Sequence, residues 1–269
     1  MRRLLALLLA ALALPAGHLS AAEAGSPWRG MPWHLMDYYH VLPDGQPFRS
    51  VAIELEVVRP PQPGDHVYIA ALSGSIGDQK FYAGLQTDLH DGWTRTNRGE
   101  GLIFSRWGNG EAGDGRAPAD GWVVVPNPNA AKEGAYVSIR RPMAWDVGRY
   151  LFQLQARPLS DGHGGGGMWV DLLVYDVARG TWIDGGGLRF DAAPATFRPR
   201  PASFVEVYRL EPGEDARSVP PMEVILRGPV LNGAHGPLGG TARIPKDVPP
   251  LARATAGEGA VTIVVEPAP

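Results

Sequence analysis

The sequence contains a series of short runs rich in Val, Ile, Tyr, Phe and Trp, each bounded by turn residues. The 35 glycines and 26 prolines of the sequence separate these runs. No stretch keeps the period of an amphipathic helix for more than about two turns. Such punctuated runs are typical of an all-β sandwich or barrel. They predict strands near 51–58, 66–72, 79–87, 101–107, 121–125, 134–140, 149–156, 168–175, 203–209, 222–227 and 259–266.

Several runs alternate in polarity, as a strand does when one of its faces packs against a core. In "RYLFQLQA" the apolar residues share one face, and the two glutamines share the other. In "MWVDLLVYD" a second apolar face follows the same period of two. We therefore expect an all-β domain, a two-layer antiparallel β-sandwich that buries these faces between its sheets. The expected core includes Phe152, Leu154, Met168, Val170 and Leu172.

The N-terminal segment has the three-part pattern of a secretory signal peptide. Two arginines precede an apolar run from Leu4 to Leu14, which Pro15 and then small residues follow. The apolar run is shorter than the roughly 20 residues that a membrane-spanning helix needs. We expect residues 1–24 to be removed, so that the mature protein is secreted or periplasmic and has no membrane span.

The remainder of the chain divides by composition into three parts. Residues 25–48 form a lead-in rich in aromatic residues and proline, and residues 49–228 form the sandwich domain. Residues 229–269 form a Gly/Pro-rich linker and a C-terminal strand. An apolar, β-branched strand is costly to leave exposed, so we expect this last strand to return to the main sheet.

Cysteine content and charge restrict the classes of partner. The chain has no cysteine, so its core must hold the fold without disulfides even in an oxidising compartment. The formal net charge is -3 and no basic patch stands out in the sequence. Nucleic acid is therefore not an expected partner.

Five short motifs follow one another in a characteristic order. They are "FYAGLQT", "LIFSRWG", "MAWDVGRYLFQLQARP", "VYDVARGTWIDGGGLRF" and "SFVEVY". This order resembles a domain-of-unknown-function family of secreted bacterial β-sandwich proteins, over roughly residues 65–210. Such domains are similar to lectin- and glucanase-like jelly rolls of the concanavalin A type. The resemblance implies a jelly-roll fold and export, and it implies no catalytic residues.

A polar loop between two strands is the best candidate for a ligand site. In the strand at 79–87, Gly84 predicts a close approach to the backbone, by a ligand, a bulge or an aromatic neighbour. The loop at 88–101 carries one tryptophan among charged residues and asparagine. Sugar rings stack on exposed Trp and Tyr while polar neighbours bind the hydroxyls. By contrast, Trp107 and Trp145 lie on strands and are expected in the core. The expected ligand-binding residues are Tyr82, Gln86, His90, Trp93, Arg95 and Arg98.

Two arrangements could support catalysis on this scaffold. Glu54 and Glu56 share a strand face, and retaining glycosidases use two carboxylates about 5 Å apart. A solvent-facing side of an amphipathic strand has the same pattern. Polysaccharide lyases use Tyr and His with Arg or Gln, and the segment "DYYH" (37–40) with Gln86, His90 and Arg95 offers these residue types. Its order reproduces no lyase motif.

Metal binding has weaker signals. The histidines do not pair at the spacings that zinc sites use, so no zinc site is expected. Calcium binds through oxygen ligands in Gly-rich loops, and Asn109, Glu111 and Asp114 supply oxygens between glycines. Plain turns have the same composition. We therefore expect no cofactor, with calcium as the open alternative.

Together these patterns support three functional hypotheses. The first is an exported, non-catalytic β-sandwich that binds a polysaccharide, a cell-surface glycan or another extracellular ligand. The second is a carbohydrate-active enzyme, a glycoside hydrolase or polysaccharide lyase, on the same scaffold. The third is a structural or adhesion module. A pair of ionisable side chains converging in a groove would distinguish the second from the first.

Overall fold

The computed structural model describes residues 32–42, 47–91, 96–108, 110–125, 134–158, 167–191, 196–198, 200–211, 213–235, 240–246 and 248–269. The expected signal segment, residues 1–24, lies outside these ranges. Within them, no helix is long and apolar enough to cross a membrane.

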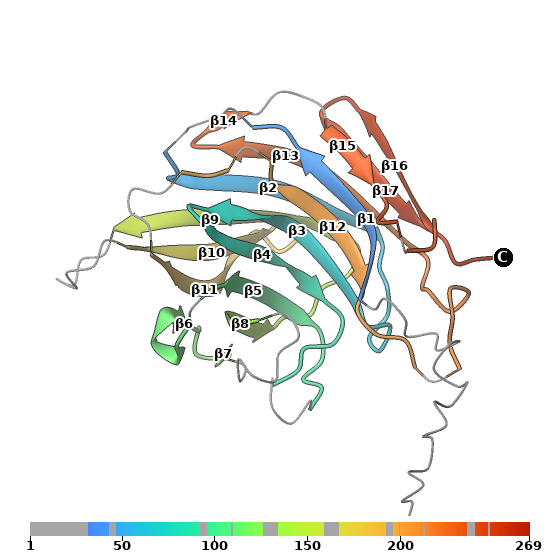
Figure 1. The fold of residues 1–269 in the computed structure, drawn as a ribbon, viewed down its shortest axis with the longest axis horizontal. Helices are drawn as coiled ribbons and strands as arrows, with labels where there is room; N and C mark the ends of the chain where they lie inside the picture. The colour runs from blue at the N-terminus through green and yellow to red at the C-terminus, as the bar shows by residue number, and fades with distance from the viewer. Residues whose placement is uncertain are drawn as a thin grey trace, which may run out of the picture.

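Two antiparallel sheets stack face to face (Figure 1), which confirms the predicted two-layer β-sandwich. One sheet has eight strands and the other has nine. In spatial order the first contains β15 (Gly240–Arg243), β1 (Trp33–His40), β12 (Ala202–Val207), β3 (Val67–Ile76), β4 (Gln79–Gln86), β5 (Gly101–Trp107), β8 (Tyr136–Pro142) and β7 (Trp122–Val124). The second contains β16 (Ala252–Gly257), β17 (Ala260–Val265), β13 (Met222–Leu231), β2 (Ser50–Arg59), β9 (Gly148–Pro158), β10 (Met168–Asp176), β11 (Thr181–Phe190) and β6 (Gly115–Arg116), with β14 (Ala234–His235) beside β13.

The core lies between the sheets, where the alternation of the strands predicts it. The five core residues expected in β9 and β10 are at most 4% exposed, so this prediction is confirmed. Each buried side chain of this size stabilises the fold by about 1.5–3 kcal/mol relative to exposure. The core thus holds the sandwich without disulfides.

The structure adds strands that local patterns did not predict. The strand β11 contains three consecutive glycines, Gly185, Gly186 and Gly187, which weaken any strand signal. The structure requires them: a Cβ at Gly185 would approach the Leu172 side chain within 2.6 Å, and Gly186 has a φ of +86°. The register with β10 shifts at this place, so the glycines accommodate a β-bulge.

The expected division of the chain differs from the structure at both ends. The lead-in contributes β1, which pairs with β12 and β15 inside the eight-stranded sheet. The expected boundary at residue 228 falls within β13, which continues to Leu231. The C-terminal strand β17 pairs with β13, so its expected return to the sheet is confirmed.

Candidate functional site

A groove lies on the outer face of the eight-stranded sheet, the face turned away from the core. Its volume is about 510 Å³, and residues of β1, β12, β3, β4 and β5 line it. The side chains that concern its chemistry are His34, Asp37, Lys80, Tyr82, Trp107 and Glu206, with Arg200 at one end.

A bulge in β1 brings two polar residues to the same face. Residues three apart on a regular strand point to opposite faces. Here the register shifts between His34, which pairs with Glu206, and Met36, so that Asp37 pairs with Phe204. One extra residue therefore turns His34 and Asp37 to the groove side, as bulges do when they redirect a side chain.

His34 is held between two carboxylates. Its Nδ1 lies 2.9 Å from Asp37 Oδ1, and its Nε2 lies 3.3 Å from Glu206 Oε2. The imidazole stacks on Phe204, with the ring centroids 4.4 Å apart. Partial burial lowers the pKa of His34, but the hydrogen bonds and charges of Asp37 and Glu206 outweigh it and raise the pKa to about 10. At neutral pH the ring is an imidazolium that donates both N–H groups, which makes it a poor general base.

Aromatic rings continue across the groove. The ring centroids of Tyr82 and Trp107 are 4.7 Å apart, and those of Trp107 and Tyr136 are 5.9 Å apart. On the other side, Tyr82 lies 6.2 Å from Phe204. Tyr82, Trp107 and Tyr136 are each only partly buried, so they offer accessible ring surface. We call Tyr82 and Trp107 the ring pair.

The position of Trp107 corrects the expectation that it belongs to the core. In β5 the inward face carries Phe104 and Arg106, and Trp107 points outward. The Arg106 side chain is fully buried and lies 3.1 Å from Asp114 Oδ2. Hydrophobicity alone would place Trp107 in the core and Arg106 on the surface. In the structure Arg106 is buried and Trp107 is partly exposed. Trp145 is buried as expected, and its indole N–H donates to the Gln86 carbonyl.

The close approach predicted at Gly84 comes from a neighbouring strand. A Cβ at Gly84 would lie 2.0 Å from the Ile69 carbonyl oxygen and 2.8 Å from Ala70 Cα. The register between β3 and β4 shifts between Ala70 and Leu72, so a bulge in β3 fills this space. No ligand is needed to explain the glycine.

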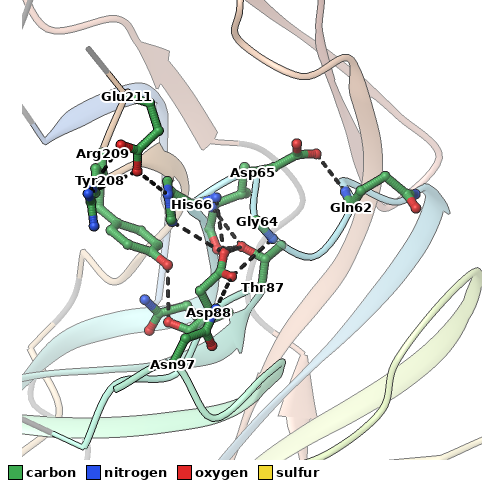
Figure 2. Close-up of polar contacts among 12 residues, drawn as sticks. Gln62, Gly64, Asp65, His66, Thr87, Asp88, Asn97, Tyr208, Arg209 and Glu211 are labelled. Carbon is green, nitrogen blue, oxygen red and sulfur yellow. Dashed lines mark hydrogen bonds and ion pairs between the residues drawn. The ribbon is translucent and has the colours of Figure 1, made fainter. Parts of the chain in front are cut away.

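The loop that follows β4 is anchored by a buried carboxylate, Asp88 (Figure 2). Its oxygens accept hydrogen bonds from the Gly64 and His66 amides, the Thr87 hydroxyl and the Asn97 amide group, at 2.7–3.1 Å. Burial raises the pKa of Asp88, but these hydrogen bonds outweigh it, so the pKa lies below its usual value. Asp88 is therefore an ionised structural group that ties three segments together.

The same loop covers one end of the outer face. Leu89 is buried in a second apolar cluster with Tyr68, Ile103 and Phe204. His90 and Asn97 form an isolated β-bridge across the loop, and the His90 carbonyl accepts a hydrogen bond from Arg140. The described part of the loop is thus packed on the sheet.

The expected ligand-binding residues divide into three groups. Tyr82 lines the groove, whereas Gln86, four residues further along the same strand, is buried. His90 and Arg98 lie in the loop, where Arg98 Nη2 is 3.8 Å from Asp91 Oδ2. Trp93 and Arg95 lie outside the described residues, so their role stays a prediction.

His34 and Glu206 are not among the site residues expected from the sequence, although the sequence gives an indication of where Glu206 lies. The run "SFVEV" alternates so that Phe204 and Glu206 share a face, which the pattern alone predicts. The contact of Glu206 with His34 depends on the pairing of β1 with β12, and no local pattern reports that pairing.

The candidate lyase segment at 37–40 is split between the two faces. Asp37 and Tyr39 line the groove, whereas His40 points inward and is 3% exposed. Burial lowers the pKa of His40 to about 4. Its Nε2 lies 2.8 Å from Ser203 Oγ, which itself donates to the Ala71 carbonyl. His40 therefore lies inside the sandwich, away from the groove.

Glu54 and Glu56 lie on the other sheet. Both belong to β2 and form ion pairs with Arg227, at 2.8 Å and 2.6 Å. The structure therefore does not bring these carboxylates into the groove with the ring pair.

The weak calcium candidates are engaged in local contacts. Asp114 accepts a hydrogen bond from the Glu111 amide at 3.1 Å and pairs with Arg106, while Asn109 lies outside the described residues. Among the residues that the structure describes, no group of three or more His, Cys, Asp or Glu side chains is arranged to hold a metal ion.

In comparisons with known proteins, no family model and no curated protein sequence matches this chain.

Proposed function

We propose that this protein binds a glycan in the groove of the eight-stranded sheet and carries out no chemistry on it. The observation that carries this proposal is the ring pair, Tyr82 and Trp107, 4.7 Å apart and partly exposed beside charged side chains. Export of the protein, expected from residues 1–24, belongs to the same proposal because extracellular and cell-surface glycans would then be within reach.

The groove combines the two kinds of contact that sugars use. Ring faces of Tyr82 and Trp107 suit the C–H faces of a pyranose, and polar groups fix its orientation. The hydroxyl of Ser73 and the carboxylates of Asp37 and Glu206 stand along the same groove. A carboxylate that already accepts from His34 keeps further lone pairs, so it can also accept from a sugar hydroxyl.

The state of His34 favours binding over catalysis. Hydrolases and lyases need a group that gives or takes a proton near the working pH. The imidazolium of His34 has a pKa of about 10 and is held by both of the carboxylates that line the groove. The carbohydrate-active enzyme considered above would need a free acid and base among these residues.

A glycan array followed by titration tests the proposal. With the best glycan, Trp107→Ala should weaken binding by about 10- to 150-fold, which corresponds to the roughly 1.5–3 kcal/mol of one buried aromatic contact. Trp182→Ala is the matched control, because Trp182 is 53% exposed on a strand of the other sheet.

The outcomes separate clearly. If Trp107→Ala keeps the wild-type melting temperature and binds the glycan with the wild-type affinity, the ring pair does not contribute to the binding site. If the wild-type protein converts the bound glycan into a product, the protein is a carbohydrate-active enzyme and the proposal of binding without chemistry is wrong.

A further inference from the structure

One end of the groove has the composition of an anion-binding surface. The segment Ser73–Gly74–Ser75 of β3 lines the groove there, and we call it the serine segment. Lys80 of β4 is the register partner of Ser75 on one side. On the other side, Ala202 pairs with Ser73 and the Arg198 amide donates to the Ser75 carbonyl, so Arg200 lies beside the same segment.

The two cations beside the serine segment are available. The side chains of Lys80 and Arg200 make no ion pair or hydrogen bond with another residue that the structure describes. Asp78, an acidic residue in the turn between β3 and β4, is paired with Arg198. Ser73 donates its hydroxyl to the Ala202 carbonyl, and the Ser75 hydroxyl has no hydrogen bond to any residue in the described ranges.

Whereas the whole chain has a negative net charge, the groove carries more positive than negative side chains. The charged side chains that line it are three cations, His34, Lys80 and Arg200, and two carboxylates, Asp37 and Glu206. His34 neutralises part of the carboxylate charge at the far end of the groove. A chain with a net charge of -3 thus carries a locally positive groove, which attracts anions from solution.

We propose that the glycan carries an anionic substituent, a carboxylate or a sulfate, which Lys80 and Arg200 bind at the serine segment while a sugar ring lies on the ring pair. This inference rests on the proposed function, since it names the class of glycan that the groove accepts. Arginine supplies planar paired donors that match carboxylate and sulfate oxygens, and lysine supplies a point charge. The Ser75 hydroxyl adds a neutral donor.

The test compares two anionic oligosaccharides with their two neutral counterparts by titration calorimetry at low and high salt. They are oligogalacturonate, its methyl ester, and a sulfated dextran oligosaccharide measured against plain dextran. The anionic ligands should bind more tightly than their neutral counterparts, and the difference should shrink at high salt because the site is exposed. Lys80→Gln and Arg200→Gln should each weaken anionic binding by about 2- to 5-fold, as exposed charge pairs do, and weaken neutral binding by less. Lys246→Gln, an exposed lysine outside the groove, is the control.

Failure of this inference is distinguishable from failure of the proposed function. If anionic and neutral ligands bind equally and Trp107→Ala weakens both, the proposed preference for an anionic glycan is wrong. The proposal that the groove binds a glycan then still holds. Binding of none of the ligands and of no other glycan on the array would overturn both. Preference for the galacturonate or for the sulfated ligand would support the inference and identify the anion.

Discussion

At the scale of single residues, the groove depends on charges that are matched within the protein. His34 contacts Asp37 and Glu206, and the ring stacks on Phe204. A cation held between two carboxylates keeps both of them in fixed positions beside the ring pair. The groove can then present carboxylate oxygens to sugar hydroxyls without a full double negative charge.

The protonation of His34 gives a prediction for pH. The pKa of about 10 in the folded state lies above the usual 6.5. The contact therefore contributes stability that is fully present below pH 6.5 and is lost as the pH rises through about 10. NMR titration of the imidazole signals between pH 5 and pH 11 should show His34 protonated at neutral pH. Glu206→Gln should lower its midpoint, and a wild-type midpoint near 6.5 would contradict the described contacts.

At the scale of elements, bulges determine which side chains reach the outer face. The bulge in β1 places His34 and Asp37 together, and the bulge in β3 brings its backbone against Gly84. After each bulge the alternation of the strand resumes with the opposite phase. Each bulge inserts one extra residue into its strand. The two bulges therefore help to determine which polar and aromatic side chains line the groove.

Gly84 provides the test at this scale. Gly84→Ala should lower the free energy of unfolding by about 1–3 kcal/mol, since its Cβ would meet backbone atoms that cannot rotate away. Gly113→Ala is the matched control, because a Cβ there meets no atom within 4 Å. Urea unfolding of both variants measures the difference. Equal midpoints would show that β3 and β4 are less closely packed than described.

At the scale of the whole molecule, the two outer faces differ. The eight-stranded sheet carries the groove and its rings, whereas the nine-stranded sheet carries ion pairs such as those of Arg227 with Glu54 and Glu56. Segments from both ends of the chain complete the sandwich, with β1 in one sheet and β17 in the other (Figure 1). The lead-in and the C-terminal strand therefore belong to one cooperative unit.

Truncation tests this unity. A chain that ends at Leu231 lacks β17, whose Val261, Ile263 and Val265 are at most 3% exposed. Its removal exposes apolar core and an unpaired edge of β13, so we expect a lower melting temperature and aggregation. Thermal unfolding of the full and shortened chains measures this. An unchanged, cooperative transition in the shortened chain would show that the C-terminal strands are an independent appendage.

Local patterns predicted the fold class, most strand positions and the core faces of β9 and β10. This was possible because apolar and polar side chains alternate between consecutive residues of a strand. The same patterns also indicated Tyr82 as a ligand-binding residue. They could not assign Trp107, because burying Arg106 instead depends on Asp114 lying opposite it in space. The contact of His34 with Glu206, the groove over five strands and the place of Glu54 and Glu56 on the other sheet became clear from the three-dimensional fold. These facts follow from the pairing and bulges of strands far apart in the chain, and such pairing is a free-energy balance over the whole core that no short segment encodes.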